Sequence, residues 1–253
     1  MTNQPLLQVR ELRKAFGEQK VLEGIDLEVR KGETLTILGR SGSGKSVLLK
    51  LIIGLQKPDS GSIWIGDAEV TGLERDQLDE IRKKIGFLFQ YSALYDSLTV
   101  EENVAFPLRR HTRMADHERR ERVRDLLARV GMENALAKMP GDISGGMKKR
   151  VGLARALAME PDLMLMDEPT AGLDPLTAGE IIDLILELQR SRSMSSVVVT
   201  HEMQTVRAVS DRVAMLDEGR IRVEGTFEAL KHSPDSLVAA FVKQGTEGEP
   251  CHA

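Results

Sequence analysis

One stretch of the sequence has the residue types and spacing of a phosphate-binding loop, and its eight members are Gly39, Arg40, Ser41, Gly42, Ser43, Gly44, Lys45 and Ser46. They fit the pattern G-x-x-x-x-G-K-[ST]. Small residues let backbone N–H groups close around an anion, and the start of a following helix adds partial positive charge. We expect Lys45 to reach the β- and γ-phosphates of a nucleotide and the hydroxyl of Ser46 to bind Mg²⁺.

The residues on either side supply the elements that such a loop needs. Residues 34–38 are typical of a buried strand, and the apolar residues 47–53 are typical of a helix. A glycine-rich turn that fits the pattern by chance is the alternative. The strand before the loop and the helix after it favour the functional interpretation.

Two adjacent acids stand at the end of another predicted strand. Asp167 and Glu168 follow the apolar run 163–166 directly, and open α/β sheets bind ligands at the carboxyl ends of their strands. Asp167 suits a residue that holds Mg²⁺ through its water shell. Glu168 suits a base, or a group that orients water, for attack on the γ-phosphate. An ordinary solvated loop with two acids is the alternative.

Two more polar residues end predicted strands. His201 follows the apolar run 196–200, and Gln90 follows 85–89. His201 could contact the γ-phosphate or the attacking water, although a single histidine at a strand end is more often structural. Gln90 could sense Mg²⁺ or water, but its local signal is weak.

The N-terminal part of the chain predicts an antiparallel layer. Residues 6–13 alternate apolar and polar side chains, and residues 21–29 give a second strand. Phe16 stands in the turn between them. It could be an aromatic on which a nucleotide base stacks, or a core phenylalanine at a turn.

A helical insert is predicted at 91–139, between the two parts of the α/β core. Thr99 and Glu102 fit a capping box, so a helix should begin at Thr99. Pro107 is expected to limit that helix to residues before it. The basic residues near 119–124 alternate with acids, and we interpret them as a solvated face rather than a nucleic-acid patch.

The remaining pattern completes an α/β protein. After the core helix predicted at 148–159, a helix is expected at 178–189 and a hairpin at 213–223. Short helices should follow at 227–231 and 237–242. The polar residues 245–253 are predicted to be a disordered tail.

Composition limits the function classes. The 253 residues are enough for one large α/β domain or two small ones, and the net charge of −4 disfavours general nucleic-acid binding. The single cysteine, Cys251, excludes an internal disulfide and suits a reducing compartment. No run approaches the ~18 apolar residues that cross a bilayer, and residues 1–5 lack a secretory pattern. We therefore expect a cytoplasmic protein whose membrane role, if any, comes through a partner.

Taken together, the motifs resemble the ATP-binding cassette subunits of ABC transporters along nearly the whole chain. The family order is matched by the aromatic Phe16, the phosphate loop at 39–46, Gln90 of the Q-loop, the signature residues Ser144, Gly145 and Gly146, Asp167 and Glu168 after the Walker B strand, the D-loop residue Asp174, and the switch His201. The resemblance implies ATP and Mg²⁺ as cofactors. It places Ser46, Gln90 and Asp167 around the metal, and Glu168, His201 and Gln90 in catalysis.

The same resemblance implies a fold and an assembly. The expected fold is α/β, a P-loop NTPase core with an antiparallel β layer and a helical subdomain. A single domain is expected over 1–244, with its core at 6–90 and 156–244 and the helical subdomain at about 91–155. Two cassettes would pair as a head-to-tail homodimer, with each ATP between the phosphate loop of one and the signature of the other, and Asp174 at the seam. An integral membrane permease would be the partner, which places the chain on the cytoplasmic face of the inner (plasma) membrane.

The signature departs from the usual pattern at its ends. Ile143 stands where leucine is usual, and Met147 stands in place of glutamine, so any side-chain hydrogen bond from that position is lost. The Ser-Gly-Gly-Met run, and the segment 89–109 after the Q-loop strand, resemble the cassettes of Mla-type phospholipid transporters that work with MCE-domain proteins. That resemblance implies a lipid cargo, an MCE-domain partner and, in related transporters, a small regulatory subunit.

Three rival functions stay open. The first is a transporter of another solute, such as an amino acid, a metal or a drug. It stays open because the sequence of a cassette says little about the cargo. A soluble ABC ATPase of translation or DNA repair would carry tandem cassettes or coiled-coil inserts, which this chain lacks. A nucleotide sensor without hydrolysis is disfavoured by Glu168 and His201.

Overall fold

The computed structural model describes residues 4–192 and 194–246, and the chain divides into two compact units. The first unit comprises the segments Met1–Glu74 and Ser195–Ala253, and the second comprises Arg75–Met194. The division predicted from the sequence, with a helical subdomain at about 91–155, has other boundaries and stays a prediction. Among the described residues, no helix is both long and apolar enough to cross a membrane.

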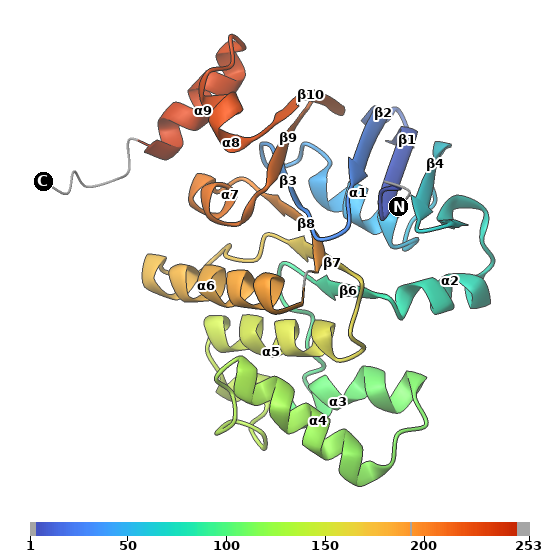
Figure 1. The fold of residues 1–253 in the computed structure, drawn as a ribbon, viewed down its shortest axis with the longest axis vertical. Coiled ribbons are helices and arrows are strands. Elements are labelled where there is room, and N and C mark those ends of the chain that lie inside the picture. Colours follow the sequence, from blue (N-terminus) through green and yellow to red (C-terminus); the bar gives the residue numbers. More distant parts are fainter. Residues whose placement is uncertain (1–3, 193, 247–253) are drawn as a thin grey trace, which may run out of the picture. The chain divides into compact units, whose positions relative to one another are not determined.

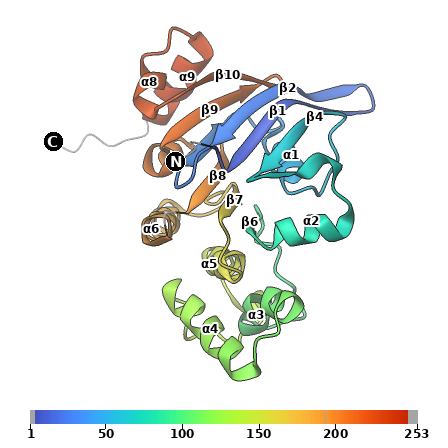
Figure 2. The ribbon, with the colours of Figure 1, turned by 45° about the vertical axis from the view of Figure 1, so that its right-hand side comes forward.

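The first unit contains the antiparallel layer. Its strands, which lie in the order β2-β1-β4-β5, are β1 (Leu7–Phe16), β2 (Gln19–Val29), β4 (Ser60–Ile65) and β5 (Ala68–Glu69). Figure 2 shows β1, β2 and β4 side by side. Leu7 and Val9, two residues apart, are completely buried as the alternating pattern predicts, and Leu12 is completely buried beyond a register shift in the pairing of β1 with β2. A short 3₁₀ helix at Val70–Gly72 follows β5.

The first unit also contains a mostly parallel group of strands. In the order β10-β9-β3-β8, these are β3 (Thr34–Leu38), β8 (Ser195–Thr200), β9 (Arg212–Asp217) and β10 (Arg220–Gly225). β3 runs parallel to both of its neighbours, and Leu38 at its end pairs with Thr200 of β8. The chain therefore leaves β3 and β8 at the same edge, which brings the starts of two predicted functional segments together.

The helices of the first unit pack around this group. They are α1 (Lys45–Ile52), α7 (Met203–Val209), α8 (Phe227–Lys231) and α9 (Ser236–Thr246). One buried cluster joins Leu38 of β3 and Met215 of β9 with Val206, Leu230 and Val238 from the last three helices. The sequence patterns did not predict α7. The predicted tail is wrong at its first two residues, which end α9, and residues 247–253 lie outside the described part.

The second unit holds two parallel strands with helices beside them. Its elements before and after the helical insert are α2 (Arg75–Arg82), β6 (Ile85–Leu88), β7 (Leu163–Asp167) and α6 (Pro175–Arg192). Leu88 at the end of β6 pairs with Met166 of β7. The residues that follow the two strands therefore emerge at one edge.

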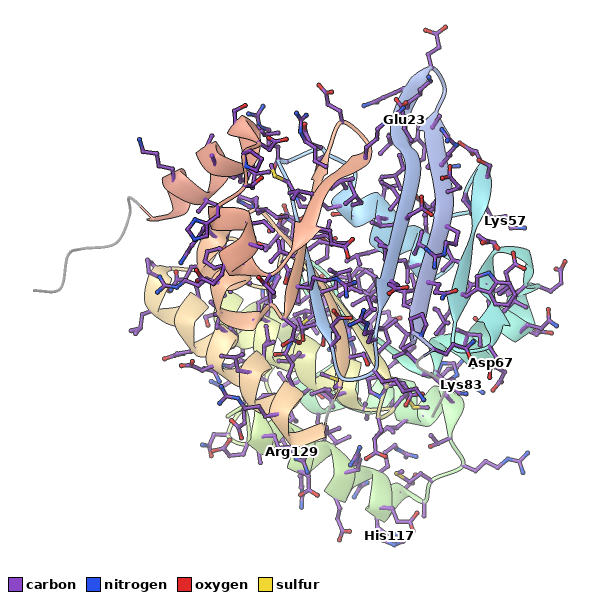
Figure 3. All side chains as sticks on the ribbon, turned by 45° about the horizontal axis from the view of Figure 1, so that its top comes forward. Glu23, Lys57, Asp67, Lys83, His117 and Arg129 are labelled. Carbon is purple, nitrogen blue, oxygen red and sulfur yellow. The ribbon has the colours of Figure 1, made fainter. Side chains whose placement is uncertain are left out.

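Three helices and a short turn form the insert. They are α3 (Val100–His111), α4 (Asp116–Arg129), the 3₁₀ turn Pro140–Asp142 and α5 (Gly145–Leu157). The three helices pack on one another, as Figure 1 shows for the green and yellow segments. Figure 3 labels His117 and Arg129 near the two ends of α4. The charged residues of α4 form ion pairs such as Arg122 with Glu160, as expected for a solvated face.

The structure confirms one boundary of α3 and corrects the other. Thr99 caps α3 in a complete capping box, since its hydroxyl accepts from the Glu102 N–H and the Glu102 carboxylate accepts from the Thr99 N–H. Pro107 does not limit α3, which runs on to His111. Val100, Val104 and Leu108 form one buried stripe at i+4 spacing. Packing of this stripe offsets the ~3 kcal/mol that an interior proline costs a helix.

Candidate active site

The phosphate loop connects β3 with α1, as predicted. A Cβ at Gly39 would lie 2.5 Å from the carbonyl oxygen of Leu216, so no larger residue fits there. Gly42 and Gly44 have φ of +81° and +102°, a region that glycine adopts at no steric cost. The loop conformation thus depends on its glycines, and the residue types match the pattern for a structural reason.

The start of α1 suits an anion. Gly44 is its N-cap residue and offers no side-chain cap, so it leaves the first N–H groups of α1 without a capping oxygen from that residue. Lys45 is 5% exposed, and its amine donates to the carbonyl oxygens of Gly39 at 2.8 Å and Arg40 at 3.1 Å. The hydroxyl of Ser43 is buried without a hydrogen-bond partner in the described part of the chain. This donor set fits the phosphates of a nucleotide, and Ser46 stands one residue into the helix, where its hydroxyl could bind Mg²⁺.

The structure places two other predicted residues in the same unit. His201 directly follows β8 and, because Leu38 pairs with Thr200, leaves the sheet at the same edge as Gly39. Phe16 is the last residue of β1 and 45% exposed, with the amine of Lys14 5.3 Å from its ring centroid. An exposed ring is not a core phenylalanine, so the alternative weighed for Phe16 is wrong, and the ring is accessible for stacking.

The second unit carries the two acids. Asp167 ends β7 and Glu168 follows it, and each is 6% exposed. Glu168 has φ of +46°, which residues with a Cβ rarely adopt. The two side chains are therefore buried at the end of a strand, and the alternative of an ordinary solvated loop does not hold. Gln90 leaves β6 at the same edge, because Leu88 pairs with Met166.

One residue that sequence analysis did not select joins these two segments. Lys149 on α5 is 4% exposed, and its amine donates to the backbone carbonyls of Gln90 and Glu168, the latter at 2.9 Å. Gly146 and Leu153, three residues before it and four after it, are buried on the same helix. A lysine on such a face is unusual unless its amine has partners.

The signature residues begin α5. Ser144 is its N-cap, and its hydroxyl accepts a hydrogen bond from the N–H of Met147 at 3.3 Å. Gly145 is exposed, and an added Cβ would make only an ordinary contact with Leu173, whereas a Cβ at Gly146 would lie 2.4 Å from Thr177. The exposed N-terminus of α5 can therefore receive an anion.

Asp174 has a structural partner that the sequence did not indicate. Its carboxylate accepts hydrogen bonds from the hydroxyl of Thr177 at 2.6 Å and from the Thr177 N–H at 3.1 Å. These bonds lower the pKa of Asp174 below its ordinary value and cap the first turn of α6. Asp174 itself is exposed, as is Leu176, which is 77% exposed.

The predicted site residues are thus divided between the units. The first unit holds Phe16, the loop 39–46 and His201, and the second holds Gln90, the signature, the two acids and Asp174. Among described residues, no group of three His, Cys, Asp or Glu side chains forms a metal site.

Comparison with known proteins shows the family. A family model described as ABC transporter matches residues 22–171. The methionine import ATP-binding protein MetN of Brucella abortus (strain 2308) is 40% identical over 243 residues, which are 96% of this chain and 66% of the relative. The intermembrane phospholipid transport system ATP-binding protein MlaF of Haemophilus influenzae is 38% identical over 246 residues, 97% of this chain and 93% of the relative.

Solved structures show the same fold. The dimeric structure of MJ0796, a bacterial ABC transporter cassette, has a TM-score of 0.82 and 36% identity, covering 87% of this chain and 98% of that one. The structure of cbiO1 from Clostridium perfringens, part of the ABC transporter complex cbiONQ, has a TM-score of 0.82 and 31% identity. The match covers 96% of this chain and 97% of that one. The chain spans about two thirds of the length of the methionine import relative. On the family model and these relatives, this chain belongs to the ABC transporter family and has the fold of its ATP-binding cassettes.

Proposed function

We propose that the chain hydrolyses ATP to ADP and phosphate, as the ATPase subunit of a membrane transporter whose cargo is phospholipid or another hydrophobic molecule. The observation that carries the cargo is the signature Ser-Gly-Gly-Met, in which Met147 replaces the usual glutamine. The MlaF relative, named for intermembrane phospholipid transport, supports it. An MCE-domain protein would be the further partner, and a small regulatory subunit is a candidate. The chain would act on the cytoplasmic face of the inner membrane.

The residues of each unit have separate tasks in this reaction. The loop N–H groups and the amine of Lys45 would bind the phosphates, with Phe16 stacking on the base. Bound Mg²⁺ would neutralise the charge that develops on the β- and γ-phosphates. Glu168 would orient and deprotonate the attacking water, and His201 would contact the γ-phosphate. Gln90 and Asp167 would contact the metal or its waters.

A second cassette would complete the site. The exposed N-terminus of α5, with Ser144 and Gly145, would face the γ-phosphate bound to the partner subunit. The solved dimer of MJ0796 supports pairing of two cassettes. Binding of ATP would close the homodimer and hydrolysis would reopen it, which drives the permease.

The second unit has a groove that suits a permease segment. It encloses about 520 Å³, and its apolar lining includes Phe87, Phe89, Tyr95 and Phe106. The ring of Tyr95 lies 4.7 Å from that of Phe106, and Tyr91 nearby in the chain is 85% exposed. The polar lining includes His111 and Arg155, with Arg82 paired to Asp79 and Lys83 paired to Glu80. We infer that a permease helix with an apolar face docks here.

Import of an amino acid is the second candidate function. The methionine import relative is 40% identical over 243 residues, which slightly exceeds the 38% of the phospholipid relative. The ATPase chemistry is the same in both cases. Only the partners and the cargo distinguish them.

The test is purification of a tagged Glu168→Gln chain with ATP from detergent-solubilised membranes, followed by mass spectrometry of proteins and lipids. Recovery of a permease with an MCE-domain protein and phospholipid is the expected result. A permease with a solute-binding protein and no lipid would overturn the lipid cargo, and recovery of no membrane protein would overturn the transporter role.

A matched pair of variants checks that the groove makes the contact. Phe106→Asp, added to the tagged chain, should lose the permease while it retains ATP binding. Leu55→Asp places the same charge at another exposed apolar residue, 52% exposed in the first unit, and should retain the permease. Equal recovery with both variants would contradict the docking role of the groove.

A further inference from the structure

Lys149 occupies an unusual place for a lysine. The residue is 4% exposed, and its amine donates to the backbone carbonyls of both Gln90 and Glu168. These carbonyls belong to the two segments that follow β6 and β7. A single cation on α5 thus ties together the backbones that carry the proposed metal-sensing amide and the proposed base.

Arg155, six residues further along α5, makes a similar contact. Its guanidinium donates to the carbonyls of Ser92 and, at 2.7 Å, of Ala93. Between the two cations stands Gly152, where an added Cβ would lie 3.0 Å from Leu88 and 3.2 Å from Ser92. The glycine allows α5 to approach β6 and the following loop closely, so that both cations reach backbone oxygens.

The segments held by these cations have strained backbones. Among the described residues, six other than glycine have positive φ, and three of them are Ser92, Ala93 and Glu168. The backbone carbonyls of all three accept hydrogen bonds from Lys149 or Arg155. Such conformations persist only where surrounding contacts hold them, and they concentrate at functional sites.

We propose that Lys149 is a positioning residue for ATP hydrolysis, because its buried amine sets the backbone, and hence the side-chain direction, of Glu168 and Gln90 relative to α5. Lys149 acts through these two residues and does not itself touch the nucleotide. The start of α5 carries Ser144 and Gly145, so a shift of that helix must move both segments. The inference rests on the proposed ATP hydrolysis and is independent of the cargo.

Two substitutions weaken the contact of Lys149 with the two carbonyls to different degrees. Lys149→Met keeps an unbranched side chain and removes every donor, which leaves two buried carbonyls without this partner. Lys149→Gln retains an amide nitrogen with two N–H donors on a chain one bond shorter and without the charge, so it should hold the two carbonyls more weakly than lysine does. We expect kcat to fall about tenfold or more for Lys149→Met and about threefold for Lys149→Gln, with KM for ATP within about twofold of wild type.

Controls separate positioning from loss of stability or charge. Lys148→Met removes the same charge one residue earlier, from a partly exposed position, and should leave kcat unchanged. Leu153→Ala changes a residue of α5 that is 2% exposed, so it should lower the melting temperature. At temperatures below that melting temperature, kcat should stay unchanged. In the Glu168→Gln background, Lys149→Met should still dimerise with ATP.

The outcomes decide between the inferences. A wild-type chain without ATP hydrolysis overturns the proposed function itself. If the wild type is active, an unchanged kcat in a folded Lys149→Met variant overturns the positioning role alone. A raised KM for ATP with unchanged kcat overturns it as well. If Lys149→Met fails to fold, Lys149→Gln decides: a folded variant with wild-type kcat overturns the role, and a lower kcat at constant KM supports it.

Discussion

Gly146 lies so close to Thr177 that a Cβ on the glycine would stand 2.4 Å from the threonine methyl group. Gly145, the preceding residue, has room for a Cβ at an ordinary 3.6 Å from Leu173. Two adjacent glycines of the signature therefore exist for different reasons. Gly146 permits α5 to pack against the start of α6, whereas the fold of this chain does not require Gly145.

Substitution of these glycines should separate folding from function. We expect Gly146→Ala to lower the free energy of unfolding by about 1–3 kcal/mol through overpacking. Gly145→Ala should change it by less than about 1 kcal/mol, yet weaken ATP-dependent dimerisation, because a methyl group then stands in front of the exposed helix N-terminus. Urea unfolding and size-exclusion chromatography with ATP measure the two effects. Equal destabilisation by both variants would contradict this assignment.

Removal of the Glu168 carboxylate should abolish turnover and spare binding. We expect Glu168→Gln to lose about 10²- to 10⁴-fold in kcat, the usual contribution of a general base, while it still binds ATP and forms the closed dimer. Glu160→Gln is a matched control, because Glu160 also has positive φ, +53°, but pairs with Arg122 at the surface. Steady-state hydrolysis by the two purified variants tests the role, and near-wild-type turnover of Glu168→Gln would exclude it.

The amine of Lys45 should contribute to nucleotide affinity. Hydrogen bonds from charged groups are worth about 1.5–3 kcal/mol, so Lys45→Ala should raise the Kd for ATP by about 10- to 100-fold. Lys50→Ala, in the last turn of the same helix, removes an equal charge at a partly exposed position and should leave the Kd unchanged. Isothermal titration calorimetry measures both values. A Kd that is the same in Lys45→Ala and wild type would contradict the phosphate-loop assignment.

Asp174 should make the stability of the chain depend on acidic pH. Hydrogen bonds from Thr177 lower its pKa in the folded state, so the carboxylate stabilises the fold at pH values above its unfolded pKa of about 3.9. This contribution is lost as the pH falls through the lower folded pKa. The difference in unfolding free energy between wild type and Asp174→Asn should therefore shrink between pH 5 and pH 2.

Thr177→Ala provides the companion variant for that titration. It removes the hydroxyl that donates to Asp174 at 2.6 Å and should reduce the same pH dependence. Chemical denaturation at several pH values measures the differences. If the difference in unfolding free energy between wild type and Asp174→Asn grew toward low pH, the hydrogen bonds from Thr177 would not stabilise the charged carboxylate.

Local pattern was enough to predict the features that depend on near neighbours in the chain. The strand 34–38, the helix after the glycine-rich loop and the capping box at Thr99 follow from the sequence pattern and are confirmed in the structure. Glycine spacing, apolar runs and capping residues act within a few residues of each other, so the sequence alone is enough to identify them. The family followed from the order of such motifs, and the comparisons confirm it.

Contacts between distant segments decided the rest. Pro107 was expected to limit α3, but burial of Leu108 carries that helix onward. The exposure of Phe16 and the different needs of Gly145 and Gly146 depend on which side chains lie opposite them in the fold. In the sequence, Lys149 is one of several basic residues after the signature. Only the packing of α5 brings its amine to carbonyls 59 and 19 residues away, because burial of a charge depends on acceptors that tertiary structure alone supplies.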